Sequence, residues 1–274
     1  MTATTQGMLP ALLDDTIAYQ RWPFTKALPP VHSSGETQSV IPSLPSPGSI
    51  KPFLNEHSTL RGLKLCSRRQ PCKSRLCPWC STRKASQTRA DLRREAVQHA
   101  SVLNLTLSVS SSPSFSDAWV ALAATRAEFT RSRWLATKST SRFRQTEVTH
   151  TEQGWHLHDN WLLFGDDQQL HSLLTTIIPR WLDSASRTGT TAHPLGQHAT
   201  LTPHKSDALS YTSKGLLAQH ASHTSAQGRT PGDLLALFHA GDADAAEAWH
   251  ELESFFKIRG HRWVATGGNL RGKS

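Results

Sequence analysis

Hydrophobic and polar residues alternate along several stretches of the chain, and these stretches predict strands. Residues 102–110, VLNLTLSVS, place Leu or Val at every second position with Asn, Thr and Ser between them. This is the period of a strand that buries one face. Residues 141–149 and 155–164 are also predicted strands, and the loop HTEQG between them predicts a hairpin. The last predicted strand is 197–203.

Apolar residues that recur every three or four positions predict helices between and after the strands. The predicted helices span residues 116–136, 166–186 and 206–218. The first opens with a Ser cap, and its stripe consists of Trp119, Leu122, Arg126 and Phe129. The resulting order is β-α-β-β-α-β-α. Its first six elements match a split βαβ arrangement, which predicts an α+β fold with a ferredoxin/RRM-like antiparallel sheet and helices on one face.

Composition divides the chain into four predicted parts. Residues 1–60 are rich in proline and predict a mostly disordered arm. Residues 61–98 hold all the cysteines and a basic helix, and residues 99–218 hold the regular strands and helices. A break rich in Gly, Ser and Gln leads to the last part, residues 219–274, which is predicted to be a helical segment because of DADAAEAWHELESFFKI.

The chain lacks the hydrophobic segments that membrane insertion or secretion requires. It has no run of about 18 apolar residues, which a membrane-spanning helix needs. Its first ten residues, MTATTQGMLP, lack the basic and apolar regions of a secretory signal. We therefore expect a cytoplasmic protein with no membrane partner.

Positive charge is concentrated in one block. Residues 61–98 hold eleven Lys/Arg and two acids, a net charge of +9 that equals that of the whole chain. Such a block favours a polyanionic partner, most often nucleic acid. A solvated helix face is the alternative interpretation. The candidate DNA-binding residues are Arg68, Arg69, Lys73, Arg75, Arg83 and Lys84.

All four cysteines lie within this basic block. Their spacing is Cys66-x5-Cys72-x4-Cys77-x2-Cys80. Thiolates bind zinc tetrahedrally, and a CxxC turn brings two sulfurs to one ion. Disulfides are uncommon in the cytoplasm, so structural zinc (Zn²⁺) is the prediction, with free or redox-active thiols as the alternative. A four-cysteine site has no open position for substrate, and we assign it a structural role.

A predicted strand carries three candidate metal ligands. In QGWHLHDNWLLF, the side chains of His156, His158 and Asn160 share one strand face because they occupy alternate positions. Two histidines at this spacing can reach one divalent ion, and Glu147 on the partner strand is a candidate third ligand. The chain has fifteen histidines, so the alternative is that these two have no special role.

The predicted helix 206–218 carries a candidate nucleophile. Tyr211 is one of only two tyrosines, and both Lys214 at i+3 and Asp207 at i−4 share its helix face. A neighbouring ammonium favours the phenolate form of tyrosine. A histidine-bound metal ion would polarise a phosphate as a Lewis acid. Together with the basic block, these groups predict phosphodiester transesterification, whereas a capped surface helix is the alternative for Tyr211.

These motifs resemble those of the plasmid rolling-circle replication initiator (Rep) proteins within the HUH endonuclease superfamily. LNLTLS resembles the first motif of that family, EVTHTEQGWHLHDNWLLF the second and YTSKGL the third. The cysteine cluster CKSRLCPWC and the tail GRTPGDLL…FFKIRGHRWVATGGNLRG are similar to those of the plasmid branch. The resemblance runs from about residue 60 to the end, with the motifs in the family's order.

The resemblance implies a bacterial, plasmid-associated nickase in which residues 99–218 are the catalytic domain. Tyr211 would attack one phosphate of a single strand exposed at the double-strand origin, forming a 5′-phosphotyrosine and freeing a 3′-OH. Mg²⁺ or Mn²⁺ would serve the chemistry, separately from zinc. The implied partners are the origin DNA, host helicase and polymerase, and a second copy in a homodimer.

Asn160 departs from the family pattern. The family row commonly reads His-x-His-x-His before apolar residues, and its last two histidines bind the metal. Aligned in that way, the pair here is His158 and Asn160. Either the ion uses His156 and His158, or Asn160 replaces a histidine through its carbonyl oxygen, which suits Mg²⁺ or Mn²⁺. A weakened or inactive nickase is a third possibility.

Two further alternatives concern the end of the reaction and the class of protein. Asp207 is either the cap of its helix or a base that activates water to end the cycle. The protein itself is alternatively a non-catalytic, zinc-stabilised DNA-binding protein, or a relaxase or transposase of the same superfamily. Relaxases usually carry their tyrosine ahead of the histidines, whereas Tyr211 follows them.

Overall fold

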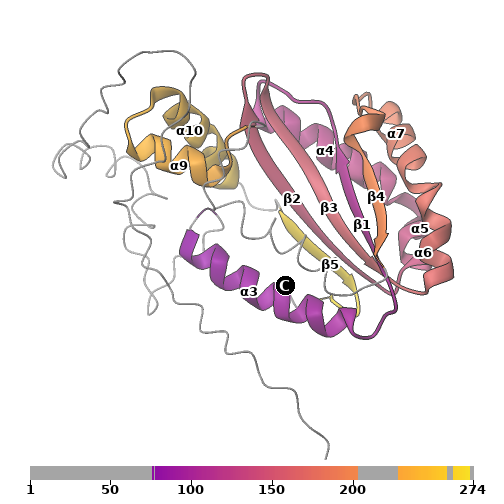
Figure 1. Ribbon diagram of the computed structural model, residues 1–274. Coiled ribbons are helices and arrows are strands. Elements are labelled where there is room, and N and C mark those ends of the chain that lie inside the picture. The colour runs from indigo at the N-terminus through magenta and orange to yellow at the C-terminus, as the bar shows by residue number, and fades with distance from the viewer. Residues whose placement is uncertain (1–75, 77, 203–227, 258–261, 272–274) are drawn as a thin grey trace, which may run out of the picture. The chain divides into compact units, whose positions relative to one another are not determined.

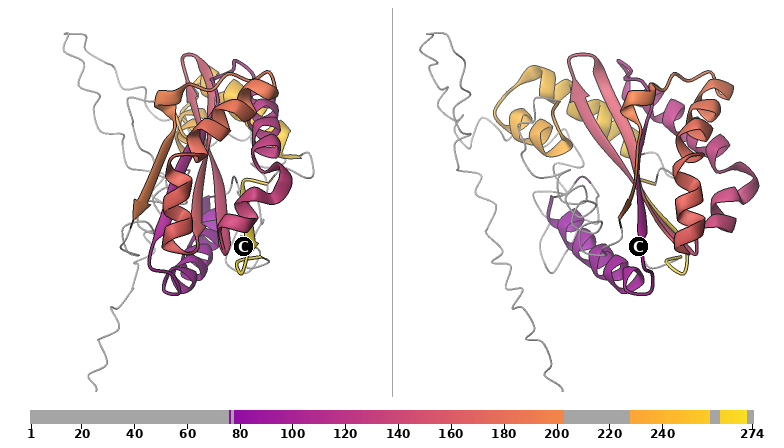
Figure 2. Two further views of the ribbon diagram at one scale, coloured as in Figure 1. Left: turned by 90° about the vertical axis from the view of Figure 1, so that its right-hand side faces the viewer. Right: turned by 45° about the vertical axis from the view of Figure 1, so that its right-hand side comes forward.

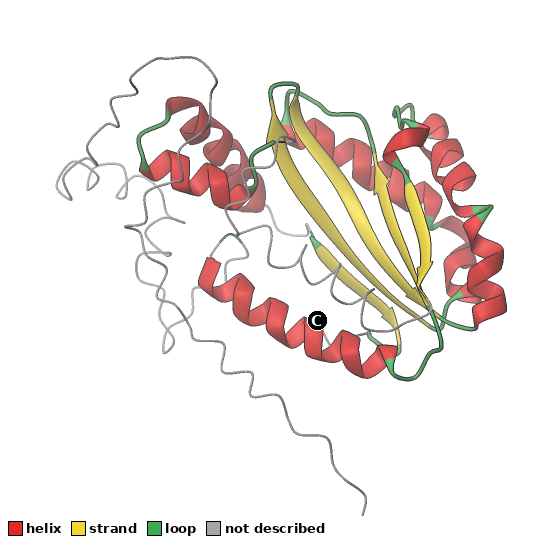
Figure 3. Ribbon diagram, viewed as in Figure 1, coloured by secondary structure: helices red, strands yellow, loops and turns green. Residues whose placement is uncertain are grey.

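The computed structural model describes residues 76, 78–202, 228–257 and 262–271 (Figure 1). All of these belong to one structural unit, Leu44–Ser274. The unit is α+β, with a five-stranded antiparallel sheet and helices (Figure 3). The predicted α+β class with an antiparallel sheet is thus confirmed.

Helices and strands are interspersed along the described part of the chain. The helices are α3 (Pro78–Ala96), α4 (Phe115–Phe129), α5 (Trp134–Lys138), α6 (Asp167–Leu174), α7 (Ile177–Arg187), α9 (Pro231–His239) and α10 (Ala243–Lys257). The strands are β1 (Val102–Ser108), β2 (Ser141–Thr151), β3 (Gly154–Phe164), β4 (His198–Thr202) and β5 (Val264–Gly268). Two short 3-10 helices, Arg131–Arg133 and Pro194–Gly196, connect some of them.

The strands lie in the order β4-β1-β3-β2-β5, and each pair of neighbours is antiparallel. The β2–β3 hairpin is longer than predicted, since β2 continues to Thr151 and β3 begins at Gly154. Gly154 has a φ of +96°, and a Cβ there would lie 2.3 Å from the carbonyl oxygen of Ser112. Only glycine tolerates both conditions, so this residue allows the hairpin to turn where the chain passes Ser112.

One face of the sheet packs against most of the helices, and we call it the helix face. Its apolar side chains come from alternate positions of β1 and β3, as the sequence pattern predicts. They pack with α4, α6, α7, α9 and α10 in one core that includes Leu105, Leu157, Trp181 and Trp249. The burial of these large side chains supplies the main stabilisation of the fold.

The opposite face carries His156, His158 and Asn160, and we call it the histidine face. The part of this face around Phe143 and Phe164 is apolar. It packs against α3 through Leu92 of the helix. Figure 2 shows α3 and the α4–α7 helices on opposite sides of the sheet. The helix therefore packs on the apolar part of this face, and the polar rows that carry the histidines continue from it along the strands.

Two predicted helices are each interrupted. The helix predicted at 116–136 begins at Phe115, with Ser114 rather than Ser116 as its cap, and α4 ends at Phe129. In the helix predicted at 166–186, α6 ends at Leu174 and α7 begins at Ile177. Pro179 explains this second break, because proline lacks an N–H and its ring conflicts with the carbonyl four residues earlier.

The C-terminal part is not helical throughout. The predicted helix there is confirmed as α10, but α9 precedes it and β5 follows it. β5 pairs with β2 along Ser141–Gln145, so it extends the same sheet. Glu251 of α10 accepts hydrogen bonds from the Phe115 N–H at 2.6 Å and from the Trp155 indole N–H at 2.7 Å, which fastens α10 to α4 and β3.

Several predicted features lie outside the described residues. They are the arm 1–60, the helix 206–218 and residues 61–75 and 77 of the cysteine segment. Of the predicted basic module, α3 is described. Within the described part of the chain, no helix combines the length and apolar character needed to cross a membrane.

Candidate functional site

The polar end of the histidine face is organised as rows of side chains across three strands. Strand register determines these rows, because directly paired residues of neighbouring strands point to the same side of the sheet. One row consists of Thr106, Asn160 and Gln145, and the next of Ser108, His158 and Glu147. His156 pairs with Thr149 in the row beyond. The three predicted ligands of β3 are therefore brought together on one face, as the alternation predicted.

Glu147 lies directly opposite His158. The His158 Nε2 and Glu147 Oε2 atoms are 2.8 Å apart, and about a fifth of each side chain is exposed. The sequence placed Glu147 on the partner strand, and this is confirmed. The carboxylate meets His158 rather than His156 because the two-residue turn sets the register of the hairpin.

His156 lies beside this pair. Its ring centroid is 5.8 Å from that of His158, and its Nδ1 is 3.4 Å from the Ser111 hydroxyl. Burial lowers the pKa of His156 below its ordinary value, and repulsion from His158 lowers it further. The imidazole is consequently neutral at pH 7 and keeps a lone pair for a metal ion.

Asn160 is held by the neighbouring strand. The Thr106 hydroxyl donates a hydrogen bond to Asn160 Oδ1 at 2.9 Å. The amide oxygen, the atom through which asparagine would bind a metal, is thus already engaged. This contact favours His156 and His158 as the ligand pair over His158 and Asn160.

Gln145 completes the row on the other side of Asn160. Its side chain is only 2% exposed. Neither its Oε1 nor its Nε2 atom has a hydrogen-bond partner in the part of the chain that the structure describes. A buried amide with both polar groups unpaired is uncommon in folded proteins and calls for an explanation.

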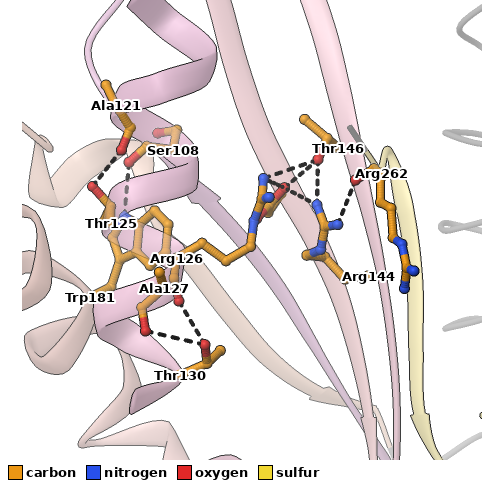
Figure 4. Close-up of polar contacts among 11 residues, drawn as sticks. Ser108, Ala121, Thr125, Arg126, Ala127, Thr130, Arg144, Thr146, Trp181 and Arg262 are labelled. Carbon is orange, nitrogen blue, oxygen red and sulfur yellow. Dashed lines mark hydrogen bonds and ion pairs between the residues drawn. The ribbon is translucent and has the colours of Figure 1, made fainter. Parts of the chain in front are cut away.

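Asp159 points to the helix face, between the two histidine-face residues that flank it, and is fully buried. Figure 4 shows Arg126 and Arg144 converging there, with Thr146 beside them. Asp159 accepts from Arg126 Nε at 2.6 Å, from Arg144 Nη1 at 3.1 Å and from the Thr146 hydroxyl at 2.7 Å. Burial alone would raise the pKa of Asp159, but the two guanidinium groups outweigh it and hold the pKa below its usual range.

This network also explains why Arg126 stands in the apolar stripe of α4. Its side chain reaches across the core side of the helix to the buried carboxylate of β3. Arg144 is anchored further by a hydrogen bond from its Nη2 to the carbonyl oxygen of Arg262 at 2.7 Å. The network holds α4, β2 and Arg262, two residues before β5, to β3, so it has a positioning role behind the histidine rows.

The remaining predicted site residues have different outcomes. Arg83 and Lys84 are exposed on α3, where they can meet a polyanion. Cys80 lies in the first turn of the same helix. The other predicted residues lie outside the described part of the chain: Cys66, Cys72, Cys77, Arg68, Arg69, Lys73, Arg75, Asp207, Tyr211 and Lys214.

The donors on the histidine face have the chemistry of a divalent-metal site. Two imidazoles and a carboxylate suit Mn²⁺ and similar ions, and amide oxygens suit Mg²⁺. Among the described residues, however, no three His, Cys, Asp or Glu side chains are gathered closely enough to hold a metal ion. The donor types therefore fit a divalent ion, while Glu147 and His158 contact each other directly.

The structure adds residues that the sequence reasoning missed. Thr106, Gln145 and His198 lie in one row with Asn160, since Thr106 pairs with His198 of β4 as well. The signal was present in the alternation of β1, where Thr106 was expected on the polar side. Gln145 and His198 required the strand register, which only the folded sheet determines.

No family model, curated protein or solved structure matches this chain.

Proposed function

We propose that this protein is a metal-dependent DNA nicking and rejoining enzyme that initiates rolling-circle replication of a plasmid, as a Rep protein of the HUH superfamily does. The observation that carries the proposal is that His156, His158 and Glu147 share one face of an antiparallel sheet, with His158 and Glu147 in contact. Supporting it, the order β4-β1-β3-β2 is the one expected for a ferredoxin-like split βαβ sheet.

The proposed chemistry is a transesterification. Tyr211 attacks the phosphorus of one phosphodiester, a bond forms from its Oη to phosphorus, and the bond to the 3′ oxygen breaks. The products are a 5′-phosphotyrosine and a free 3′-OH, which takes up a proton. Lys214 would favour the phenolate of Tyr211 and balance charge on the phosphate. Mg²⁺ or Mn²⁺, held by His156, His158 and Glu147, would supply Lewis-acid polarisation.

The face behind the histidines suits this role because buried ion pairs support it. Asp159 is neighbour in sequence to both His158 and Asn160, and its ion pairs with Arg126 and Arg144 hold β3 from the opposite side. A site that must place metal and phosphate within a fraction of an ångström requires such support.

Duplex DNA would bind to the basic surface that includes α3. Arg83, Lys84 and Arg93 are exposed there, while Leu92 packs on the sheet. Lysine and arginine that contact phosphates give binding that weakens with salt. We propose that zinc bound by Cys66, Cys72, Cys77 and Cys80 stabilises the segment before this helix, and that host helicase and polymerase act on the nicked origin.

One observation favours a rival function, a non-catalytic DNA-binding protein. Within the described chain no three-ligand metal group is formed, and Asn160 stands where the family commonly has a histidine. Such a protein would bind the origin and leave it intact.

A cleavage assay separates the two functions. A labelled single-stranded origin oligonucleotide is incubated with the full chain and Mn²⁺, with Mg²⁺, or with chelator. We expect a covalent protein–DNA adduct with either metal, and its loss with chelator and in Tyr211→Phe. Binding without an adduct would support the non-catalytic protein, and an adduct that persists in Tyr211→Phe would disprove the role of Tyr211.

A further inference from the structure

Gln145 is a buried side chain whose polar groups have nothing to bind in the described structure. It is 2% exposed, and both its amide oxygen and its amide nitrogen lack a hydrogen-bond partner there. Trp161, Trp249 and Trp263 also bury an unpaired group, but each leaves a single indole N–H. Gln145 instead leaves a donor and an acceptor together, the combination that binds a water molecule or a ligand oxygen beside a cation.

A second buried glutamine shows what a structural role looks like in this fold. Gln197 is 5% exposed, and its Oε1 accepts from the Ser108 N–H at 2.8 Å. Its Nε2 donates to the carbonyl oxygens of Ser108 and His193. Every polar group of Gln197 therefore has a partner, whereas Gln145 adds no hydrogen bond that would stabilise the described fold.

The position of Gln145 connects it to the candidate metal site. It is directly opposite Asn160 and two residues before Glu147 on the same strand face. Directly paired residues have Cβ atoms about 5 Å apart, and the diagonal neighbour, here His158, lies about 7 Å away. A hydrated divalent ion at Glu147 and His158 would thus place one of its water molecules within reach of the Gln145 amide.

The chemistry of the row agrees with this placement. The Thr106 hydroxyl donates to Asn160 Oδ1, and Asn160 is paired with Gln145 on its other side in the register. Mg²⁺ and Mn²⁺ keep several water molecules or other oxygen ligands when bound to proteins. Neutral amides suit such oxygens because they can both donate and accept.

We propose that Gln145 is a positioning residue for a divalent cation, and that its amide, together with Asn160, binds the oxygen ligands of the ion at Glu147 and His158. This inference rests on the metal site of the proposed function and deepens it. The row of Thr106, Asn160 and Gln145 then binds the hydration shell, whereas His156, His158 and Glu147 are the direct ligands.

The first test measures the thermal stability of the full chain without added Mn²⁺ or Mg²⁺. Gln145→Leu removes two buried unpaired groups, so its melting temperature should equal or exceed that of the wild type. Gln197→Leu, the matched control, breaks a paired amide and should lower the melting temperature by about 2–4 °C or more. A Gln145→Leu variant that loses as much as Gln197→Leu, or fails to fold, would overturn the proposal.

The second test measures Mn²⁺ binding by the electron paramagnetic resonance signal of free Mn²⁺, without DNA. His158→Ala identifies binding at this face. Gln145→Leu should raise the dissociation constant for Mn²⁺ about 10-fold or more. This is the size of effect expected for a residue that orients a metal's ligands. Gln145→Glu should lower the dissociation constant, because the added carboxylate faces the cation. Unchanged Mn²⁺ affinity in both Gln145 variants would overturn the proposal.

These outcomes are independent of the cleavage assay. Adduct formation with unchanged Mn²⁺ affinity in Gln145→Leu would leave the proposed function standing and remove the role of Gln145. Weaker Mn²⁺ binding in Gln145→Leu without any adduct in the wild type would keep the cation site and remove the nicking function.

Discussion

The Nε2 atom of His158 and the Oε2 atom of Glu147 lie 2.8 Å apart across the β2–β3 hairpin. Both belong to long neighbouring strands, so their separation is set by backbone pairing over eleven residue pairs. His156 lies beside them with its pKa lowered by burial. Two imidazoles next to a carboxylate are a donor set for a divalent ion. Four predictions test this set and the scaffold that holds it.

The first prediction concerns the identity of the metal pair. Asn160 Oδ1 is engaged by Thr106, so we expect His156 and His158 to be the ligands. His156→Ala should weaken Mn²⁺ binding about 10-fold to 100-fold, and nicking should fall with it. Asn160→His should change Mn²⁺ affinity less than about 3-fold, or about 0.7 kcal/mol, because it alters no direct ligand. A large gain in Asn160→His would instead identify His158 and Asn160 as the pair.

The second prediction concerns the buried carboxylate behind the site. Asp159→Ala leaves Arg126 and Arg144 without their shared counter-ion, and removing one partner of a buried pair costs about 3–5 kcal/mol of unfolding free energy. Urea denaturation measures this loss. The control is Asp183→Ala, whose ion pair with Arg187 is exposed and should contribute less than about 1 kcal/mol. Equal losses in the two variants would show that the buried network does not stabilise the fold.

The third prediction concerns the attachment of α10. Glu251 accepts from the Phe115 N–H and from the Trp155 indole N–H. Hydrogen bonds to a charged group contribute about 1.5–3 kcal/mol each, so Glu251→Ala should lower the unfolding free energy by about 2 kcal/mol or more. Glu247→Ala, on an exposed part of the same helix, should change it by less than about 0.5 kcal/mol. A cost for Glu251→Ala no larger than that control would disprove this role.

The fourth prediction is a dependence of stability on pH. Burial lowers the pKa of His150, and Arg229 lowers it further. Below the ordinary value of 6.5 the unfolded chain therefore binds more protons than the folded one, and stability falls as pH decreases through that range. His156 and His239 act in the same direction. We expect urea denaturation to show lower stability at pH 5.5 than at pH 7.5.

His150→Gln tests whether His150 causes part of that pH dependence, and His193→Gln is the control. The variant removes one titrating group, so stability should decrease less steeply between pH 6.5 and 5.5 than in the wild type. His193→Gln changes an exposed histidine and should keep the wild-type slope. If both variants keep that slope, His150 does not contribute to the acid sensitivity.

Much of the fold could be predicted because its signals are local. The alternation of β1 and β3 assigns each side chain to a face, since successive side chains of a strand point to opposite sides. The helical spacing of α10 is equally local. The breaks at Thr130 and at Thr175–Thr176 were missed, although Pro179 was a signal for the second.

The candidate site was predicted in part for the same reason. That His156, His158 and Asn160 share a face follows from their spacing alone. Which residue each one meets does not, because a shift of register would change every partner. Glu147 lies nine residues before His156, and this spacing made it a candidate third ligand. The short turn after Thr151 places it opposite His158.

The amino-acid sequence by itself thus determined the stretches that form β1 to β4, the shared face of the three ligand candidates and the basic character of α3, because these depend on spacing and composition within short segments. Only the tertiary structure decided that β5 joins β2, that Arg126 and Arg144 share Asp159, and that Gln145 is buried without a hydrogen-bond partner in the described part of the chain. These features pair residues that are distant along the chain, and such pairs are selected by packing and burial over the whole sheet.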